Sequence, residues 1–189
     1  SVAHPLIRPA LLADGITAFF GGFYMTFYTL LALEGLGLSQ TVTALLIGAG
    51  GVGALTSAWI AEPVGRWMGR GPAMVGFLTV GLAGNLLIPL SLLAGAFAVP
   101  LLLVQQLAGD ALLGAYRIQA ITLRQREVNE EELGRANATF HVVTGFALAV
   151  GGLAAGELSG AVGLQTTLWI ASFGGLLAVP ALLVSSLSR

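Results

Sequence analysis

Three ionisable side chains, Asp14, Asp110 and Arg117, stand inside long runs of apolar residues. A carboxylate with no partner in apolar surroundings tends to bind a proton, and it can release that proton when its surroundings change. An arginine stays charged and requires a counter-ion or water. These residue types indicate binding and release of protons rather than covalent catalysis.

Asp110 and Arg117 belong to a polar stripe on one predicted helix. Its members follow one another at steps of four, four, three and seven residues: Gln106, Asp110, Gly114, Arg117 and Arg124. With 3.6 residues per turn, these steps return to the same side of an α-helix. One wall of this helix is therefore expected to be polar.

The runs that carry these side chains are long enough to cross a membrane. A hydrocarbon core about 30 Å thick requires roughly 20 apolar residues in an α-helix. Six windows reach this length with few charges in their interiors: 10–33, 41–61, 72–93, 98–123, 137–157 and 165–187. We expect an all-α membrane protein with six transmembrane helices.

The composition supports this class and excludes others. Hydrophobic residues make up 56% of the chain and charged residues 9%, against about 25% charged residues in soluble domains. A net charge of −1 argues against a nucleic-acid partner, which requires clustered basic side chains. With no cysteine, two distant histidines and no nucleophile beside a base, we expect no metal, no cofactor and no enzyme activity.

The arginines predict how the chain is oriented. All but Arg117 stand near the chain ends or in two of the five connectors: Arg8, Arg66, Arg70, Arg124, Arg126, Arg135 and Arg189. The other three connectors, near 34–40, 94–97 and 158–164, contain no arginine. Because arginine-bearing connectors stay in the cytoplasm, we expect an integral membrane protein with both termini on the cytoplasmic side.

Helix geometry predicts the depth of the ionisable groups. Asp110 is about 12 residues from the outer end of its helix, near the bilayer midplane, and Arg117 lies about 10 Å closer to the cytoplasm. Asp14, on an antiparallel helix, reaches a depth similar to that of Arg117. An Asp14–Arg117 ion pair is therefore geometrically possible, as a structural pair or as part of a transport pathway.

Asp110 has no basic partner at its own depth, so two interpretations stay open. In one, it is protonated or bonded to Gln106 and only packs between helices. In the other, it changes protonation with conformation and couples proton movement to a second solute. Tyrosines and glutamines on these helices either line a cavity or mark helix contacts: Tyr24, Tyr28, Tyr116, Gln105 and Gln119. His141 either handles protons or forms an ordinary hydrogen bond.

The second and fifth windows are rich in small residues, such as Ala49, Gly53, Gly152 and Gly156. Small residues four positions apart let helix backbones approach closely in lipid. These faces either pack within the bundle or form a sliding surface against another six-helix unit.

Local signals refine the helices. Residues 124–135 predict a short helix along the membrane surface, with Asn129 and Glu132 at the spacing of a capping box. Pro180 is expected to kink the sixth transmembrane helix, and Pro100 suits the first turn of the fourth.

The segment from Tyr116 to Thr139, YRIQAITLRQREVNEEELGRANAT, carries a family resemblance. An aromatic residue, a Leu-Arg-Gln triplet and a Gly-Arg-x-Asn-Ala-Thr run, with Gly134, Arg135 and Asn137, occur at this spacing. The segment resembles the one after the tenth helix of major facilitator superfamily efflux proteins, in the enterobactin-exporter and macrolide-efflux branch. The likeness extends more diffusely from residue 4 to the C-terminus.

A second resemblance lies between the second and third windows, in VGRWMGRGP. It is similar to the superfamily's helix-two-to-three loop motif, which caps helices and forms a charge relay on the cytoplasmic side. Gly69 and Arg70 match the motif, whereas Arg66 stands where its aspartate is expected and Trp67 where its arginine is expected. This resemblance implies a degenerate copy, as in the second half of the family's chains.

The resemblance implies a fold and a function. The family's chain has two six-helix halves, each a 3+3 inverted repeat whose first and fourth helices face a central cavity. This chain matches the C-terminal half, with repeats expected at 1–93 and 94–189. The implied activity is proton-coupled antiport, the export of drugs, siderophores or similar amphipathic molecules by alternating access. The candidate cavity or proton-coupling residues are Asp14, Tyr24, Gln106, Asp110, Tyr116 and Arg117.

A single half supplies one wall of a cavity, so alternating access requires an N-terminal half or a second copy of the chain. The expected partners are membrane lipid, a small-molecule substrate, protons and that other six-helix unit. The alternative is a non-transporting membrane module for assembly or interaction, in which the polar groups only pack and the small-residue faces bind another protein.

Overall fold

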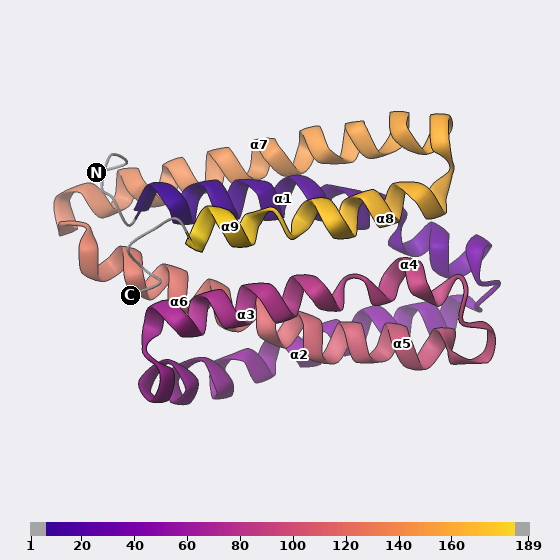
Figure 1. The fold of residues 1–189 in the computed structure, drawn as a ribbon, viewed down its shortest axis with the longest axis horizontal. Coiled ribbons are helices and arrows are strands. Elements are labelled where there is room, and N and C mark those ends of the chain that lie inside the picture. The colour runs from indigo at the N-terminus through magenta and orange to yellow at the C-terminus, as the bar shows by residue number, and fades with distance from the viewer. Residues whose placement is uncertain (1–6, 184–189) are drawn as a thin grey trace.

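The computed structural model describes residues 7–183, and all regular structure in that range is helical (Figure 1). Within it, six helices are long and apolar enough to cross a membrane: Ile7–Gly35, Gln40–Met68, Arg70–Ser91, Gly95–Glu127, Glu130–Val162 and Leu164–Leu183. Over the described range, each predicted window falls within one of these helices to within two residues. The chain is an all-α protein with six candidate membrane spans.

Several spans are interrupted, so Figure 1 labels more elements than spans. α1 (Ile7–Leu30) ends in a π-helical turn, Leu31–Gly35, and α2 (Gln40–Met68) follows it. The third span comprises α3 (Arg70–Gly84) and α4 (Leu87–Ser91). The fourth comprises a 3-10 turn (Gly95–Phe97), α5 (Ala98–Val104), a π-helical turn (Gln105–Gly109) and α6 (Asp110–Glu127). α7 (Glu130–Val162) is the fifth span, and α8 (Leu164–Gly175) and α9 (Ala178–Leu183) form the sixth.

Prolines explain where the third and sixth spans break. A proline ring collides with the carbonyl group four residues earlier, which for Pro89 is that of Asn85 and for Pro180 that of Leu176. Asn85 and Leu176 are the first residues beyond α3 and α8. The kink predicted at Pro180 is confirmed, and Pro89 produces the same break in the third span. Pro100 lies in the first turn of α5, as expected.

Single glycines join two pairs of helices. Gly69 alone separates α2 from α3, and Gly163 alone separates α7 from α8. Their φ angles are 87° and 83°, a conformation that glycine adopts without the steric cost of a Cβ atom. The backbone conformation therefore explains why a glycine stands at position 69, whether or not the loop motif of a family is present.

The predicted surface helix over residues 124–135 is wrong. α6 continues to Glu127 and α7 begins at Glu130, so Val128 and Asn129 alone separate them. Val128 is buried against apolar residues of α1 and α7, which holds the connection against the bundle and lets both helices extend beyond the apolar windows. Asn129 is the N-cap residue of α7, as predicted, but its side chain makes no capping hydrogen bond.

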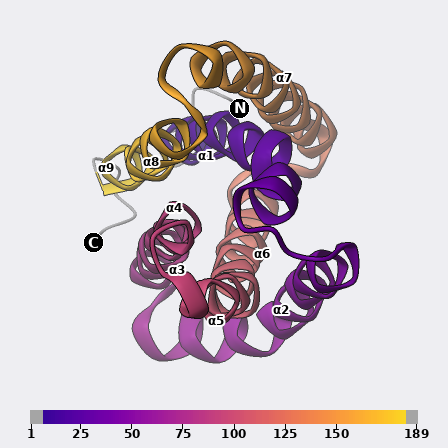
Figure 2. The same cartoon turned by 90° about the vertical axis from the view of Figure 1, so that its right-hand side faces the viewer.

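The spans form two layers of three helices (Figures 1 and 2). In one layer α1 lies between α7 and the α8–α9 span, and in the other α6 lies between α2 and α3. Each layer thus takes its central helix from the other half of the sequence. The layers do not coincide with the expected division at residue 93, and the repeat boundaries remain a prediction.

Glycine lets the central helix α1 meet α7 at backbone distance. A Cβ atom on Gly22 would collide with the backbone of α7, and one on Gly151 would collide with the backbone of Phe19. Gly145, on the same helix as Gly151, has open space at its Cβ position. Some small residues of the fifth span therefore form close helix contacts within the bundle, and others face outwards.

Two glutamines fasten the fourth span to α2. Gln106 Nε2 donates to the Leu46 carbonyl oxygen at 3.1 Å, and Gln119 Nε2 donates to the Ala61 carbonyl oxygen at 2.6 Å. The residue four positions after each accepting carbonyl is a glycine of α2. A Cβ atom added at that glycine would collide with the same glutamine. Because a helical carbonyl lies beside the side chain four residues on, only glycine leaves room for these bonds. Gln106 of the predicted polar stripe therefore faces α2.

Replacing Gly151 with alanine is expected to separate α1 from α7 and to lower the stability of the bundle. Overpacking of this kind costs about 1–3 kcal/mol, which should appear as a lower unfolding temperature of the protein in detergent. Gly145→Ala is the matched control and should unfold with the wild type. Equal unfolding temperatures for the two variants would contradict the close contact.

Candidate functional site

Asp14 lies at the junction of the two layers, where α1 faces α6. Tyr116 Oη donates a 2.7 Å hydrogen bond to Asp14 Oδ1, and a guanidinium nitrogen of Arg124 lies 3.6 Å from Asp14 Oδ2. Tyr116 and Arg124 are buried, with 2% and 8% of their surface exposed. The carboxylate thus has a hydrogen-bond donor and a cation within one enclosed cluster.

Apolar residues close this cluster on the side of α7. The guanidinium carbon of Arg124 lies 3.9 Å from the centre of the Phe140 ring, which is a cation–π contact. Ile7, Val128 and Ala136 are buried in the same group as Phe140. The charge of Arg124 is held between a carboxylate and an aromatic face.

Arg124, and not Arg117, is the ion-pair partner of Asp14 within the described chain. Helical side chains lean towards the N-terminus of their helix, so Arg124 leans towards the level of Asp14, whereas Arg117 leans away towards Asp110. Arg117 is exposed, although its charge interacts with both carboxylates. Asp14 therefore pairs with an arginine seven residues after the one considered from the sequence.

Asp110 has different surroundings. It follows the π-helical turn near the middle of its span and is partly buried against α2, where its carboxylate lies 2.5 Å from the Cβ position of Gly50. Among residues 7–183 its carboxylate forms no hydrogen bond or ion pair, and its charge interacts with Arg117 and Tyr28. Asp14 is fixed by partners, whereas Asp110 is not.

Arg117 is exposed although it lies inside a candidate span. It is about 15 Å from the end of that span at Glu127, at 1.5 Å rise per residue. A charged arginine near the centre of a membrane helix costs about 2.5–3.5 kcal/mol and therefore faces water or a partner. If the span crosses a membrane, the Arg117 side chain requires water, another protein or lipid headgroups as its surroundings.

A second polar cluster joins the layers at the break in the third span. Tyr24 Oη and Ser172 Oγ lie 2.8 Å apart, and Ser172 Oγ lies 3.1 Å from the Asn85 carbonyl oxygen. Gln105 Nε2 donates to Asn85 Oδ1 at 3.3 Å. These bonds tie α1 and α8 of one layer to the third and fourth spans of the other.

The aromatic and amide residues considered as cavity lining are largely enclosed in this unit. Tyr116, Gln105 and Gln119 are each less than 5% exposed, and Tyr24 is partly buried in its bond to Ser172. Tyr28 has a buried hydroxyl oxygen with no hydrogen-bond partner among the described residues. Their surroundings are those of helix contacts.

The residues of the two loop motifs lie at one end of the bundle. Figure 1 shows the α2–α3 and α6–α7 junctions at the same end as the start of α1. The motif residues occupy the last turn of α2, the single-residue junction and the first turns of α3 and α7: Arg66, Gly69, Arg70, Gly134, Arg135 and Asn137. His141 is exposed on α7. His4 lies outside the described residues.

Three residues of the polar clusters are not predicted from the sequence: Asn85, Phe140 and Ser172. Asn85 and Ser172 are isolated polar residues in apolar windows, the same signal that identifies Asp14, so they could have been found in that way. Phe140 carries no such signal, because its role depends on the tertiary position of Arg124.

No protein-family model matches the chain, and neither a curated protein nor a solved structure is detected as similar to it. The resemblance to efflux proteins therefore rests on the quoted sequence segments alone. The helices themselves indicate a six-span integral membrane protein.

Arg124→Gln is expected to destabilise the protein because it leaves the Asp14 carboxylate enclosed without its cation. Removing one partner of a buried pair costs about 3–5 kcal/mol, and the Tyr116 hydrogen bond should keep the loss near the lower value. Arg126→Gln, at an exposed position two residues away, is the control and should change the unfolding temperature little.

The double variant Asp14→Asn/Arg124→Gln separates the ion pair from other effects. Both charges are then absent, so the loss in the free energy of unfolding should be smaller than the sum of the two single losses. Unfolding in detergent measures all four proteins. Strictly additive losses would show that the pair contributes nothing.

Proposed function

We propose that the chain is a six-helix half of a secondary active efflux transporter that resembles the C-terminal half of a major facilitator superfamily protein. Two six-helix units enclose a central pathway and export amphipathic small molecules, such as drugs or siderophores, by alternating access. The second unit is an N-terminal half or another copy of the chain. Proton movement through Asp110 drives the export.

The observation that carries the proposal is the exposed Arg117 inside a membrane span. Its charge, together with the ionisable Asp110 nearby on the same helix, favours a neighbouring surface other than lipid. A second six-helix unit facing this side of α6 would enclose both groups with water and substrate. Without such a unit, the Arg117 side chain would have to extend along the helix to the headgroup level.

Paired features support a 3+3 inverted repeat. Gly69 and Gly163 close the second span of each expected repeat with similar backbone angles, and Pro89 and Pro180 break the third span of each. The first span of each repeat, α1 or α6, packs against the second span of the other. This arrangement brings the first and fourth spans together in the middle of the unit, the position of cavity-facing helices in such folds.

Asp110 is a better candidate for proton coupling than Asp14. Asp14 has Tyr116 and Arg124 as fixed partners. Asp110 interacts with Arg117, whose side chain is exposed. A movement of the second unit that changes the hydration of Arg117 would therefore change the affinity of Asp110 for a proton.

The proposed setting is the bacterial cytoplasmic membrane, with both termini in the cytoplasm. The arginine-bearing ends of α1, α2, α3 and α7 lie at one end of the bundle (Figure 1). Clustering of arginines on one side supports this orientation, because such segments are retained in the cytoplasm.

Transport in reconstituted vesicles tests the function. With an imposed proton gradient, the wild type should move a fluorescent amphipathic dye against its gradient, and a protonophore should abolish this movement. Asp110→Asn should lose the dependence on the proton gradient while still exchanging dye across the membrane. Glu62→Gln, which removes a carboxylate at an exposed position of α2, is the matched control and should behave as the wild type. Unchanged coupling in Asp110→Asn would remove this residue from the mechanism.

The alternative function is a membrane module that binds another protein without transporting a solute. Outward-facing small residues favour it, since Gly48 and Gly51 on α2 and Gly145 and Gly156 on α7 have open space at their Cβ positions. A purified oligomer that moves no dye from a broad panel would favour this alternative.

Cysteine cross-linking tests whether α2 and α7 meet another six-helix unit. The chain contains no cysteine, so Gly51→Cys and Gly145→Cys report on these faces alone. We expect cross-linked species in the membrane, either dimers of the chain or adducts with a separate half. Leu177→Cys, at an exposed position of the sixth span, should stay uncross-linked. A strictly monomeric protein without adducts would contradict an enclosed pathway.

A further inference from the structure

A groove runs along α1 on the side away from Asp14. It has a volume of about 630 Å³ and is lined by apolar residues of α1, among them Leu11, Leu12 and Phe19, and by Val143 of α7. Gly15 helps to open the groove because it has no side chain, and the nearest atom to its Cβ position is Val143 Cγ1 at 3.7 Å. Arg8 lines the groove near the start of α1.

We propose that this groove binds one acyl chain of an anionic phospholipid, with the headgroup phosphate held by Arg8. From Arg8 to Phe20 the groove extends about 18 Å along the helix at 1.5 Å per residue. One leaflet of a hydrocarbon core about 30 Å thick spans about 15 Å. A chain that enters at the headgroup level would therefore fill the groove as far as its aromatic end.

Charge complementarity selects the headgroup. Arg8 is the second residue of α1 and is exposed, and its side chain has no hydrogen bond or ion pair among residues 7–183. An arginine at the end of a membrane span extends its guanidinium group to the interface. Basic side chains beside grooves between helices bind anionic headgroups at this level.

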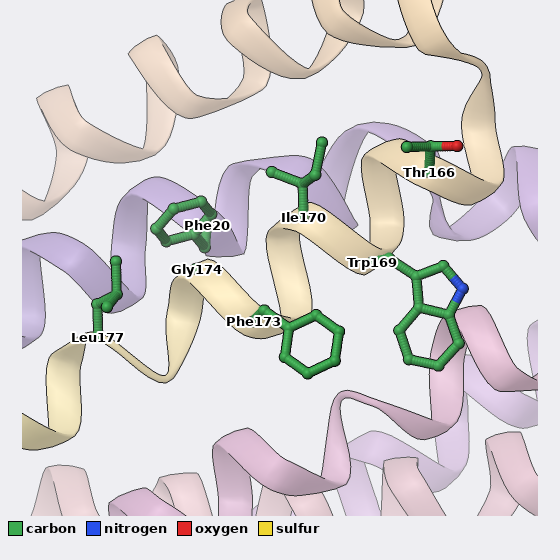
Figure 3. Close-up of a pocket in the computed structure, with 7 residues that line it drawn as sticks. All are labelled: Phe20, Thr166, Trp169, Ile170, Phe173, Gly174 and Leu177. Atoms are coloured by element: carbon green, nitrogen blue, oxygen red, sulfur yellow. The ribbon is translucent and has the colours of Figure 1, made fainter.

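A second groove on α1 provides an internal comparison. It lies on the side of α8, has a volume of about 560 Å³ and carries no charged residue in its lining (Figure 3). Figure 3 shows the rings of Phe20, Trp169 and Phe173 along it. We expect this second groove to accept acyl chains with no headgroup preference. A headgroup preference at the first groove would therefore arise from Arg8 and not from the shape of its apolar lining.

The proposal does not depend on transport, because it concerns the side of α1 opposite Asp14 and holds equally for a non-transporting module. Failure of lipid binding would leave the proposed function untouched, and absence of dye transport would leave the lipid site untouched.

Native mass spectrometry of the full chain tests the site. Delipidated protein is titrated with equimolar phosphatidylglycerol and phosphatidylethanolamine, and the wild type should retain one phosphatidylglycerol preferentially. Arg8→Gln, at an exposed position, should lower this preference about five-fold, the effect of one basic side chain near anionic lipid. Gly15→Leu should abolish the retained adduct of either lipid, because leucine fills the groove.

Three controls complete the test. Ile170→Trp fills the second groove and should leave the phosphatidylglycerol preference unchanged. Inorganic phosphate, which has no acyl chain, should not displace the lipid. If Arg8→Gln kept the wild-type preference for phosphatidylglycerol, the proposed role of the arginine would be wrong. If inorganic phosphate alone displaced the lipid, the assignment of the groove to an acyl chain would be wrong. Gly15→Ala, whose Cβ atom has room, should retain the adduct and shows that loss in Gly15→Leu is due to size.

Discussion

Backbone contact at glycine determines how close the central helices come to their neighbours, and the rest of the unit depends on that distance. In lipid, apolar surface gives little drive for helices to associate, so association depends on close packing. Gly22 brings α1 against α7, and the Cβ position of Gly53 lies 2.5 Å from the Gln106 carbonyl oxygen on the fourth span. With α1 and α6 each fastened to its own layer, Asp14 and Tyr116 come to face each other between the layers.

Polar bonds then join the layers at two levels. One level is the cluster of Asp14 with Tyr116 and Arg124, and the other is the chain of hydrogen bonds through Asn85. Asp110 and Arg117 belong to neither cluster. Because the enclosed groups hold the structure together, a change in the protonation of Asp110 would not break the bonds between the layers.

The sequence predicts the six spans and the break at Pro180, because length, hydropathy and proline sterics act locally. It also identifies Asp14 and Asp110 as ionisable groups in apolar surroundings. It does not predict the partner of Asp14, because Arg124 directly follows the fourth apolar window and is therefore assigned to a connector. Burial of Val128 against α1 and α7 extends the helices past that window, and this contact exists only once distant segments have packed.

The backbone passes from one layer to the other at two short segments, Leu36–Ser39 and Val128–Asn129, which lie at opposite ends of the bundle (Figure 1). Each acts as a tether of a few residues, and every other junction in the described chain stays within a layer. Separating the layers at either end of the bundle would stretch the connecting segment at that end. The displacement that stretches neither is a rotation of one layer against the other about the line that joins the two segments, along the length of the bundle.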